Sequence, residues 1–438
     1  MAIQIPIQKG TLLAPHLAVQ ELLGEGTFGV VVKCLDLLNK ESVAVKIVKS
    51  GHSYTQMVSK EIKILQQLLT LDSDSCSLVR WFGWFPYQSL ICLQFELLDQ
   101  SLFDFMRKRN FQPLLLAEVR HVLHQMTTAL LHLQSLKIIH NDIKPHNIMV
   151  VNQNQRPLQV KLIDFGLACH VVDAVSGTNV QSLWYRAPEV VLRMTFSESV
   201  DMWSLGLVVF EIAMGFPLLP ARHEYDLMKF IVETLGPPSV KQLGCGQRSR
   251  YFFDFVEGSQ NIWTLKTPKK FASETGHCYV DSRYASFRSL EEAMVSRIWQ
   301  TGDTDVNKAR CFVHLVQSML RVDQQARAVP LKVLRHPFLT EKPVGPPASE
   351  GARDGIIADN CRQTIHQPAG VVYFCTHASC KAPLMHQPTY LVTHQHINPH
   401  TNRPTGLPPI HVHPNFTSRT VRCVPIYQQA QVLNYLPR

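Results

Sequence analysis

Two short segments contain the residues with the clearest chemical potential. The first, IHNDIKPHN, occupies residues 139–147, and the second, DFG, begins at Asp164. Asp142 can accept the proton of an attacking hydroxyl group, and Lys144 can neutralise a neighbouring phosphoryl group. Asn147 and Asp164 supply the oxygen ligands that Mg²⁺ prefers in proteins. This combination predicts phosphoryl transfer from a nucleotide that is bound together with Mg²⁺.

A glycine-rich segment nearer the start of the chain could hold the phosphates of such a nucleotide. Residues 24–31 read GEGTFGVV, which is a G-x-G-x-x-G-x-V pattern. Glycines let backbone N–H groups approach phosphate oxygens because no Cβ stands in the way. A dinucleotide-binding loop would open a helix, whereas the β-branched residues after Gly29 predict a strand. By itself the pattern fits an ordinary glycine turn equally well, so the surrounding residues must decide.

Two charged residues downstream favour the phosphate-binding interpretation. Lys46 ends the apolar run Val43-Ala44-Val45, and Glu61 follows fifteen residues later in a stretch with helical spacing. An ion pair between them would hold the ammonium group against the α- and β-phosphates. Each charge taken singly is more often a solvated surface residue, so the prediction depends on the whole set.

The elements expected around these residues form two lobes of different class. Residues 17–50 alternate β-branched and polar positions, residues 56–70 have helical spacing, and residues 78–98 return to strands. After Asp99 helical periodicity dominates, with the main helices expected at 114–136, 200–214, 225–235 and 309–321. This predicts an α+β fold in which a small antiparallel β-sheet lobe with one key helix precedes a larger, mainly helical lobe.

The composition is that of an ordinary globular protein. The chain has 438 residues, 45% hydrophobic and 18% charged. Its formal charge of +9 comes from scattered residues, so direct nucleic-acid binding is not expected. Eleven irregularly spaced cysteines, with no cleavable apolar segment after Met1, disfavour a secreted disulfide framework. The longest apolar run, residues 205–220, is too short and polar for a membrane span and predicts a buried helix.

The last part of the chain, residues 340–438, has a different composition. It contains 13 of the 27 prolines and 8 of the 20 histidines, without helical or strand periodicity. This composition predicts a disordered C-terminal tail. Its cysteines and histidines could bind zinc, but their spacing matches no tight ligand pattern.

In this order, the motifs resemble those of a eukaryotic protein kinase across residues 17–339. The match includes the segment WYRAPE, which ends at Glu189, with Arg327 as a candidate buried partner for that carboxylate. The resemblance implies a two-lobed protein-kinase fold, with ATP and Mg²⁺ as cofactors and Asp142, Lys144, Lys46 and Glu61 as catalytic residues. Lys144, two residues after Asp142, is similar to the serine/threonine form of the catalytic loop. The implied organisation is an N-terminal extension (1–16), an N-lobe (17–98), a C-lobe (99–339) and the tail (340–438).

The resemblance also implies roles for individual residues. Leu65, His140 and Phe165 resemble the hydrophobic spine that links the lobes, and Asp201 resembles the anchor on the large central helix. Phe95 is similar to a gatekeeper, and residues 96–98 to the adenine-binding hinge. The ATP-binding residues implied are Leu23, Gly24, Glu25, Gly26, Thr27, Phe28, Gly29, Val30, Val31, Ala44, Lys46, Phe95, Glu96 and Leu98.

Finer features resemble the homeodomain-interacting protein kinases. They lie in residues 97–105, 181–186, 201–206, 263–268 and 274–276. The neighbouring dual-specificity tyrosine-regulated kinases share the first of these but fit less well around Trp263. This resemblance implies a kinase of transcriptional regulation, with a monomeric kinase domain that acts on protein substrates. Transcription factors or corepressors are its implied partners, and nuclear location is expected from the family, with the cytoplasm as the alternative.

The activation and P+1 loop departs from that family at several residues. Asn179 replaces that family's autophosphorylated tyrosine, and Leu183 replaces the arginine that pairs with the phosphotyrosine. We therefore expect weakened proline direction and a loop held by packing of Trp184 and Tyr185. In the catalytic loop, Asn141 stands where many kinases have an arginine that the resembled family also usually lacks, which implies activation independent of a phosphorylated loop. Ser182 is retained, and its family role is hydrogen bonding near the catalytic pair. His146 replaces a common glutamate, and the sequence does not distinguish drift from altered peptide selection.

Two other functions are compatible with parts of the sequence. The lost tyrosine and arginine would suit an inactive kinase-fold scaffold that binds transcriptional regulators, although Lys46, Asp142 and Asp164 are all retained. A small-molecule kinase conflicts with the Ala187-Pro188-Glu189 segment, which resembles a peptide-binding platform. The sequence thus favours an active protein serine/threonine kinase.

Overall fold

The computed structural model describes residues 7–26, 29–48, 51–258, 262–283, 289–292, 294 and 306–340. The chain divides into two compact units, residues 1–343 and 344–438, and every described residue belongs to the first. The predicted disordered tail, residues 340–438, lies outside the described residues except for Thr340, which ends a helix. No helix in the described ranges is long and apolar enough to cross a membrane.

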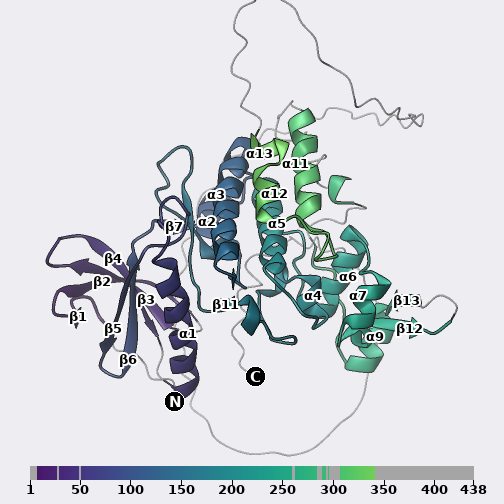
Figure 1. Ribbon diagram of the computed structural model, residues 1–438, viewed down its shortest axis with the longest axis horizontal. Coiled ribbons are helices and arrows are strands. Elements are labelled where there is room, and N and C mark those ends of the chain that lie inside the picture. The colour runs from purple at the N-terminus through teal and green to yellow at the C-terminus, as the bar shows by residue number, and fades with distance from the viewer. Residues whose placement is uncertain are drawn as a thin grey trace, which may run out of the picture. The chain divides into compact units, whose positions relative to one another are not determined.

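A six-stranded antiparallel sheet forms the N-terminal lobe (Figure 1). Its strands follow the order β1-β2-β3-β4-β6-β5, and the turn between β3 and β4 places Lys40 at a φ of 64°. The sheet begins at Leu12, five residues before the expected start of the lobe at residue 17. The strands are β1 Leu12–Ala14, β2 Leu17–Glu25, β3 Gly29–Asp36, β4 Ser42–Val48, β5 Trp81–Tyr87 and β6 Leu90–Glu96.

Alternation along the strands gives the sheet two apolar faces. Val32, Val45 and Cys92 belong to a small core of the N-lobe, whereas Leu93 belongs to a second, larger core. Because successive side chains of a strand point to opposite faces, Cys92 and Leu93 serve different cores. The larger core continues into the C-terminal lobe and joins the two lobes.

Helix α1, His52–Leu68, packs with its buried stripe against this larger core. Val58, Glu61, Leu65 and Leu68 are buried, and their spacing of three or four residues places them along one side of a helix. Glu61 is the one charged member of this group. Helical periodicity therefore directs its carboxylate inward, toward the sheet.

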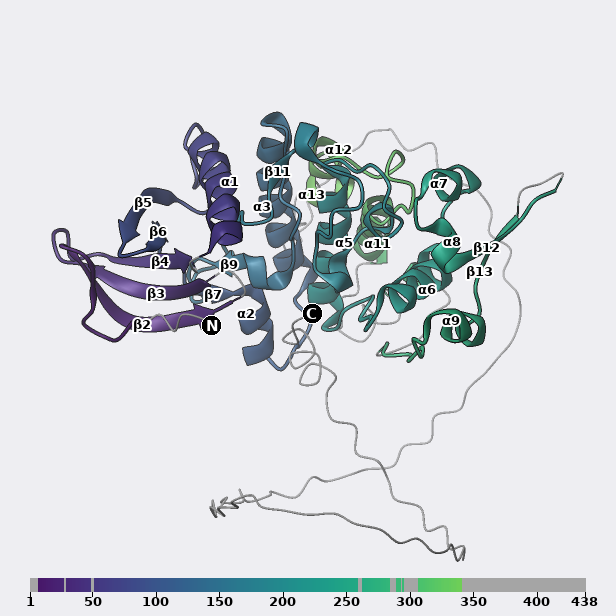
Figure 2. The ribbon, with the colours of Figure 1, turned by 90° about the horizontal axis from the view of Figure 1, so that it is seen from below.

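The C-terminal lobe is mainly helical, as predicted, and is built around helix α5, Ser199–Met214. Every residue of α5 from Val200 to Met214 is buried, and α5 packs beside α3, Leu116–Ser135 (Figures 1 and 2). The predicted apolar run continues to residue 220, but the helix ends at Met214 and is followed by Gly215, which has a φ of 77°. A Cβ there would lie 2.2 Å from the backbone oxygen of Phe111, so only glycine fits.

Shorter elements complete the lobe. Three small antiparallel sheets have the strand orders β10-β9-β7, β11-β8 and β12-β13. Their strands are β7 Gln100–Ser101, β8 Ile138–Ile139, β9 Ile148–Val150, β10 Val160–Leu162, β11 Cys169–His170, β12 Phe253–Val256 and β13 Ile262–Leu265. The remaining helices are α2 Leu102–Lys108, η1 Pro145–Asn147, η2 Val171–Asp173, η3 Leu183–Tyr185, α4 Pro188–Val191, α6 Glu224–Leu235, α7 Val240–Cys245, α8 Ser249–Phe252, α9 Pro268–Thr275, α11 Val306–Met319, α12 Pro330–Leu334 and α13 Pro337–Thr340.

Candidate active site

Lys46 lies at the centre of an ion-pair network that joins the two lobes. Its Nζ is 2.7 Å from Oε1 of Glu61 on α1 and 2.8 Å from Oδ1 of Asp164, which follows β10. Burial alone would lower the pKa of Lys46, but Asp164 and Glu61 overcome it and raise that pKa above its ordinary value. Burial would likewise raise the pKa of Asp164, yet the Lys46 ammonium group holds it at about 2. Asp164 is therefore a carboxylate at neutral pH.

Tight packing fixes the segment that begins at Asp164. Asp164 has a φ of 62°, and a Cβ on Gly166 would lie 3.2 Å from its Oδ1. The Phe165 ring packs edge-on against His140, with centroids 5.1 Å apart. Phe165 and Leu65 are buried in the larger core, and His140 is also fully buried, consistent with the spine inferred from the sequence.

Asp142 accepts hydrogen bonds from three side chains. Lys144 Nζ lies 2.7 Å and Asn147 Nδ2 2.9 Å from its Oδ2, while Ser182 Oγ donates to Oδ1 at 2.8 Å. Lys144 also donates to Ser182 at 3.0 Å, which closes a ring of three residues. The structure thus brings Ser182, 40 residues downstream, into the cluster expected from the catalytic loop.

The donor set near Asn147 fits a hard divalent cation. Its amide nitrogen donates to both the backbone oxygen and Oδ2 of Asp142, at 2.8 and 2.9 Å, which leaves the amide oxygen as the group for a cation. Asp164 offers an ionised carboxylate nearby in the fold, since Ile163 N donates to Asn147 O at 2.9 Å. Oxygen ligands of this kind suit Mg²⁺ completed by phosphates and water. Within the described ranges there is no cluster of three or more His, Cys, Asp or Glu residues that could hold a metal by itself.

Sheet register assembles several of the residues expected to contact the nucleotide. Val31 of β3 pairs with Lys46 of β4, and Ala44 of β4 pairs with Phe95 of β6. Glycine at position 29 is required by packing, because a Cβ there would lie 2.1 Å from the backbone oxygen of Ile47.

The glycine-rich loop itself is open at its described residues. A Cβ at Gly24 or Gly26 would meet no atom within 4 Å, and Leu23 and Glu25 are exposed. Val30 packs against the N-lobe core. Thr27 and Phe28 lie outside the described residues, so their expected contacts with the nucleotide stay predictions.

The expected hinge contains an ion pair that the sequence analysis did not identify. Lys161 of β10 is buried, and its Nζ lies 2.6 Å from Oε1 of Glu96 and 2.6 Å from Oδ1 of Asp74. The carboxylate of Glu96 also accepts from Arg80 N at 2.6 Å. Glu96 therefore holds the hinge through its side chain, and its backbone N–H also donates to Arg80 O at 3.0 Å. The expected contacts of Glu96 and Leu98 with the nucleotide stay predictions. The available sequence signal for this ion pair was a lysine within the apolar run of residues 160–163, where a charged side chain needs a buried partner.

Asn141 is enclosed at the position where many kinases have an arginine. It is fully buried, and its amide nitrogen donates to Leu167 O at 3.1 Å and to Cys169 Sγ at 3.2 Å. The backbone N–H groups of His140 and Asn141 donate to the carboxylate of Asp201 at 2.7 and 3.0 Å. Asp201 on α5 therefore anchors the catalytic loop, as its resemblance implied.

Gln181 ties the activation segment to α5, and sequence reasoning missed it. Its side chain is buried, donates to Val200 O at 3.1 Å and to Ser204 Oγ at 2.9 Å, and accepts from Ala187 N at 2.9 Å. It also has a φ of 66°. A polar residue in this loop gives no sequence signal of burial, because loops are normally solvated.

Packing and hydrogen bonds hold the residues after Ser182. Tyr185 is buried and its hydroxyl lies 2.6 Å from Glu211, while Trp184 Nε1 donates to Ala221 O at 2.9 Å. Leu183 packs half-buried against the larger core. These contacts agree with a loop held by Trp184 and Tyr185. Asn179, in contrast, is exposed.

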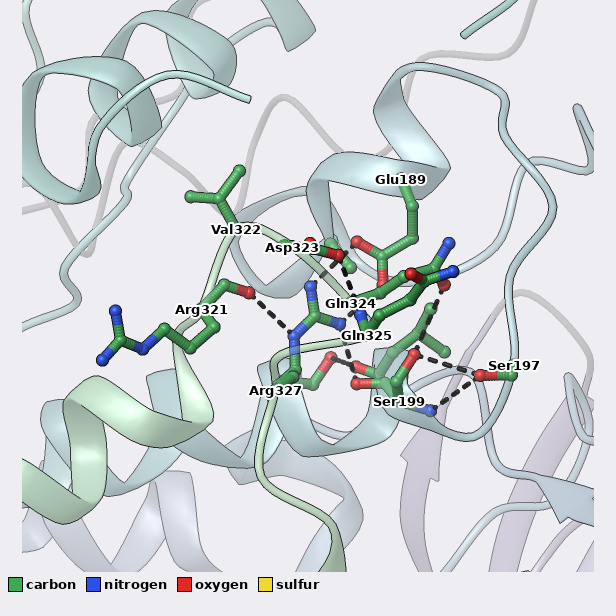
Figure 3. Close-up of polar contacts among 12 residues, drawn as sticks. Glu189, Ser197, Ser199, Arg321, Val322, Asp323, Gln324, Gln325 and Arg327 are labelled. Carbon is green, nitrogen blue, oxygen red and sulfur yellow. Dashed lines mark hydrogen bonds and ion pairs between the residues drawn. The ribbon is translucent and has the colours of Figure 1, made fainter. Parts of the chain in front are cut away.

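The end of the segment is fastened by a fully buried ion pair (Figure 3). Arg327 Nη1 and Nη2 lie 2.6 and 2.9 Å from the two oxygens of Glu189, and both side chains have no exposed surface. The remaining donors of Arg327 bind the backbone oxygens of Ser199 and Arg321, at 2.9 and 3.0 Å. The predicted Glu189 partner is confirmed, across 138 residues of sequence.

Known proteins show similarity over the same part of the chain. A family model described as "Protein kinase domain" matches residues 17–339. Homeodomain-interacting protein kinase 2 of Mus musculus is 42% identical over 328 residues, covering 74% of this chain and 27% of the relative. Homeodomain-interacting protein kinase 4 of Homo sapiens is 36% identical over 334 residues, covering 73% and 54%. The chain thus spans between about a quarter and about half of the length of these relatives.

Proposed function

Because this chain belongs to the protein kinase family, we propose that it transfers the γ-phosphoryl group of ATP to serine and threonine hydroxyls of protein substrates. The observation that carries the proposal is the network of Lys46, Glu61 and Asp164. One ammonium group is held by carboxylates from α1 and from the segment after β10, at 2.7 and 2.8 Å. This arrangement places a fixed positive charge beside a metal-binding carboxylate, as phosphoryl transfer requires.

The residues around Asp142 supply the second half of the chemistry. Its Oδ2 accepts from Lys144 and Asn147, whereas Oδ1 accepts only from Ser182 among the described side chains. Oδ1 is therefore the oxygen that receives the hydroxyl proton of the substrate. Lys144, 2.7 Å from Asp142, places positive charge next to the transferred group. Positioning and charge stabilisation provide most of the catalysis in this class of reaction.

Asn147 and Asp164 would hold Mg²⁺, which supplies charge neutralisation at the phosphates when bound. Lys46 keeps Asp164 ionised, with a pKa of about 2, so the metal ligand needs no deprotonation at neutral pH. Glu61 orients Lys46 from α1. Displacement of α1 would remove Glu61 and weaken the binding of the phosphates.

The substrates we propose are nuclear regulators of transcription, including homeodomain proteins. Support comes from the similarity to relatives named homeodomain-interacting protein kinases, at 36–42% identity. The same similarity supports nuclear location. We also propose that proline direction is weak, since Leu183 and Asn179 offer no charged pair to shape the substrate pocket. A peptide array with a strong preference for proline directly after the acceptor would contradict this part.

The test is transfer of radiolabelled γ-phosphate from Mg-ATP to a generic basic protein and to the chain itself. Wild type should transfer phosphate, and Lys46→Ala, Asp142→Asn and Asp164→Ala should each lose it by about a hundredfold or more while retaining the wild-type circular dichroism spectrum. Phosphoamino-acid analysis should give phosphoserine and phosphothreonine. A folded wild type that binds ATP but transfers nothing would instead indicate a scaffold.

A further inference from the structure

A cavity of about 230 Å³ beside the activation segment has an unusual concentration of guanidinium groups. Arg186, Arg193 and Arg248 line it, together with a single carboxylate, Glu224. Three positive charges and one negative charge leave a formal excess of two positive charges. The other lining residues are uncharged: Gly177, Thr178, Asn179 and Val190.

Glu224 neutralises only part of this cluster. Its Oε1 lies 2.8 Å from Arg186 Nη1, and its Oε2 contacts Arg248 Nη1. Arg193 is exposed and has no carboxylate within ion-pair distance among the described residues. The Nε of Arg186 is buried and has no hydrogen-bond partner among the described residues, and the side chain as a whole is only 11% exposed. A buried donor and an unpaired guanidinium group at one cavity are the features of a site for an anion.

The guanidinium groups of Arg248 and Arg186 are held in place before any ligand arrives. Arg248 stacks over the rings of Tyr251 and Phe252, at 4.5 and 5.0 Å from their centroids. Arg186 Nη2 donates to Gln181 O at 2.9 Å. The backbone oxygen of Arg193 accepts from Ser176 at 2.6 Å, which fastens its part of the wall. Preorganised donors bind an anion at a smaller entropic cost than free side chains do.

The cavity is adjacent to the residues that position the acceptor hydroxyl. Arg186 contacts Gln181, and the next residue, Ser182, donates to Asp142 Oδ1 at 2.8 Å. A peptide whose hydroxyl reaches Asp142 therefore passes close to the cavity. Residues 177–179 of the cavity wall carry no charge, so this part of the wall does not repel an anion.

We propose that this cavity binds an anionic side chain of the protein substrate, a carboxylate or a phosphate, a few residues from the acceptor. The proposal rests on the proposed kinase function and names its substrate class, namely acidic or already phosphorylated segments. Arg193 and Arg248 are the specificity-determining residues. Arg186 lies deeper and supports them.

The test measures peptide binding first, because binding does not require turnover. The probes are fluorescein-labelled peptides with one acceptor serine and with glutamate, phosphoserine, alanine or lysine placed in turn at each of five positions on either side of it. Fluorescence anisotropy then gives the Kd of each peptide for the Asp142→Asn protein in the presence of Mg-ATP. At one position, glutamate and phosphoserine should lower Kd about tenfold relative to alanine, since charge-assisted hydrogen bonds have that order of strength. Equal Kd values at all positions would overturn the proposal.

Variants of the cavity provide the specificity control. In the Asp142→Asn background, Arg193→Glu should abolish the preference for glutamate and favour lysine at the same position. Arg248→Gln should weaken it, whereas Arg250→Ala, an exposed arginine of α8 that does not line the cavity, should leave it unchanged. A preference retained in Arg193→Glu would also count against the site.

A transfer assay with the same peptides separates this proposal from the kinase assignment. Peptide transfer with no preference for anionic residues would leave the kinase function intact and overturn the cavity proposal. If anionic peptides bind preferentially but wild type transfers no phosphate, the cavity proposal stands and the kinase assignment is overturned. Mass spectrometry checks whether Thr178, at the rim of the cavity, is phosphorylated. If phosphorylated protein shows no preference for anionic peptides and Thr178→Val restores that preference, the cavity binds the chain's own phosphothreonine. That result would overturn the proposal of a substrate ligand.

Discussion

Ser182 connects the activation segment with the residues that perform the chemistry. Its hydroxyl donates to Asp142 at 2.8 Å and accepts from Lys144 at 3.0 Å, so one oxygen orients both charged groups. It has no charge of its own to contribute. Its effect on catalysis should therefore come from positioning.

Replacement by Ser182→Ala should lower kcat by about tenfold to a hundredfold, because small displacements of catalytic groups have effects of this size. KM for ATP should stay within about twofold, since Lys46 and the glycine-rich loop are untouched. Steady-state kinetics with varied ATP measure both quantities. Ser135→Ala at the exposed end of α3 is the control, and an unchanged kcat would show that Ser182 has no positioning role.

Gly29 allows strands β3 and β4 to approach each other beneath the expected nucleotide. A Cβ at this residue would lie 2.1 Å from the Ile47 oxygen, so Gly29→Ala must push the strands apart. We expect a loss of about 1–3 kcal/mol of stability, the usual size for overpacking. Urea unfolding without nucleotide measures it. Gly24→Ala, with no atom within 4 Å, should change stability little. Similar losses in both variants would show that the contact with Ile47 is not the cause.

Helix α6 contains a buried carboxylate whose ionisation should oppose folding. Burial raises the pKa of Asp226 to about 6, from an ordinary value of 3.8. Between these pH values the native state therefore binds more protons than the unfolded state does. The stability that comes from protonated Asp226 is fully present below pH 3.8 and is lost as the pH rises through about 6.

Asp226→Asn should gain stability relative to wild type as pH rises from 4 to 6 and then level off. The expected gain is on the order of 3 kcal/mol, since the pKa rises from 3.8 to about 6 and one pKa unit corresponds to about 1.4 kcal/mol. Urea unfolding across this pH range measures the difference. The matched control is Asp173→Asn at an exposed site, and a pH-independent difference for Asp226→Asn would contradict the assignment.

Hydrophobic periodicity predicted the long elements well because each of them must bury an apolar face in the core. Helix α5 spans residues 199–214 against an expected 200–214, and α3 spans 116–135 against 114–136. Strand β1 was missed because three residues are too few to show alternation. Catalytic-loop spacing predicted the cluster around Asp142. The role of Lys161 depends instead on strand register and on the folding of the loop after α1, which bring Glu96 and Asp74 to it.

Glu189 and Arg327 form a buried ion pair that joins two segments of the C-terminal lobe far apart in the sequence. Either substitution Glu189→Gln or Arg327→Met leaves a partner charge buried, and should cost about 3–5 kcal/mol of stability. The double variant should lose less than the sum, because no unpaired charge remains. Urea unfolding of the four proteins gives the coupling energy. Additive losses would show that the two side chains stabilise the lobe independently.

This pair also has a consequence for synthesis on the ribosome. Glu189 is made 138 residues before Arg327. At about 5–20 residues per second, its carboxylate therefore waits roughly 7–28 s for its partner. During that interval a nascent chain cannot bury Glu189 as the finished protein does, because the carboxylate would then be an unpaired buried charge. Arrested nascent chains that end before residue 327 should consequently remain sensitive to protease around α4, and chains that expose residue 340 outside the ribosome should become resistant.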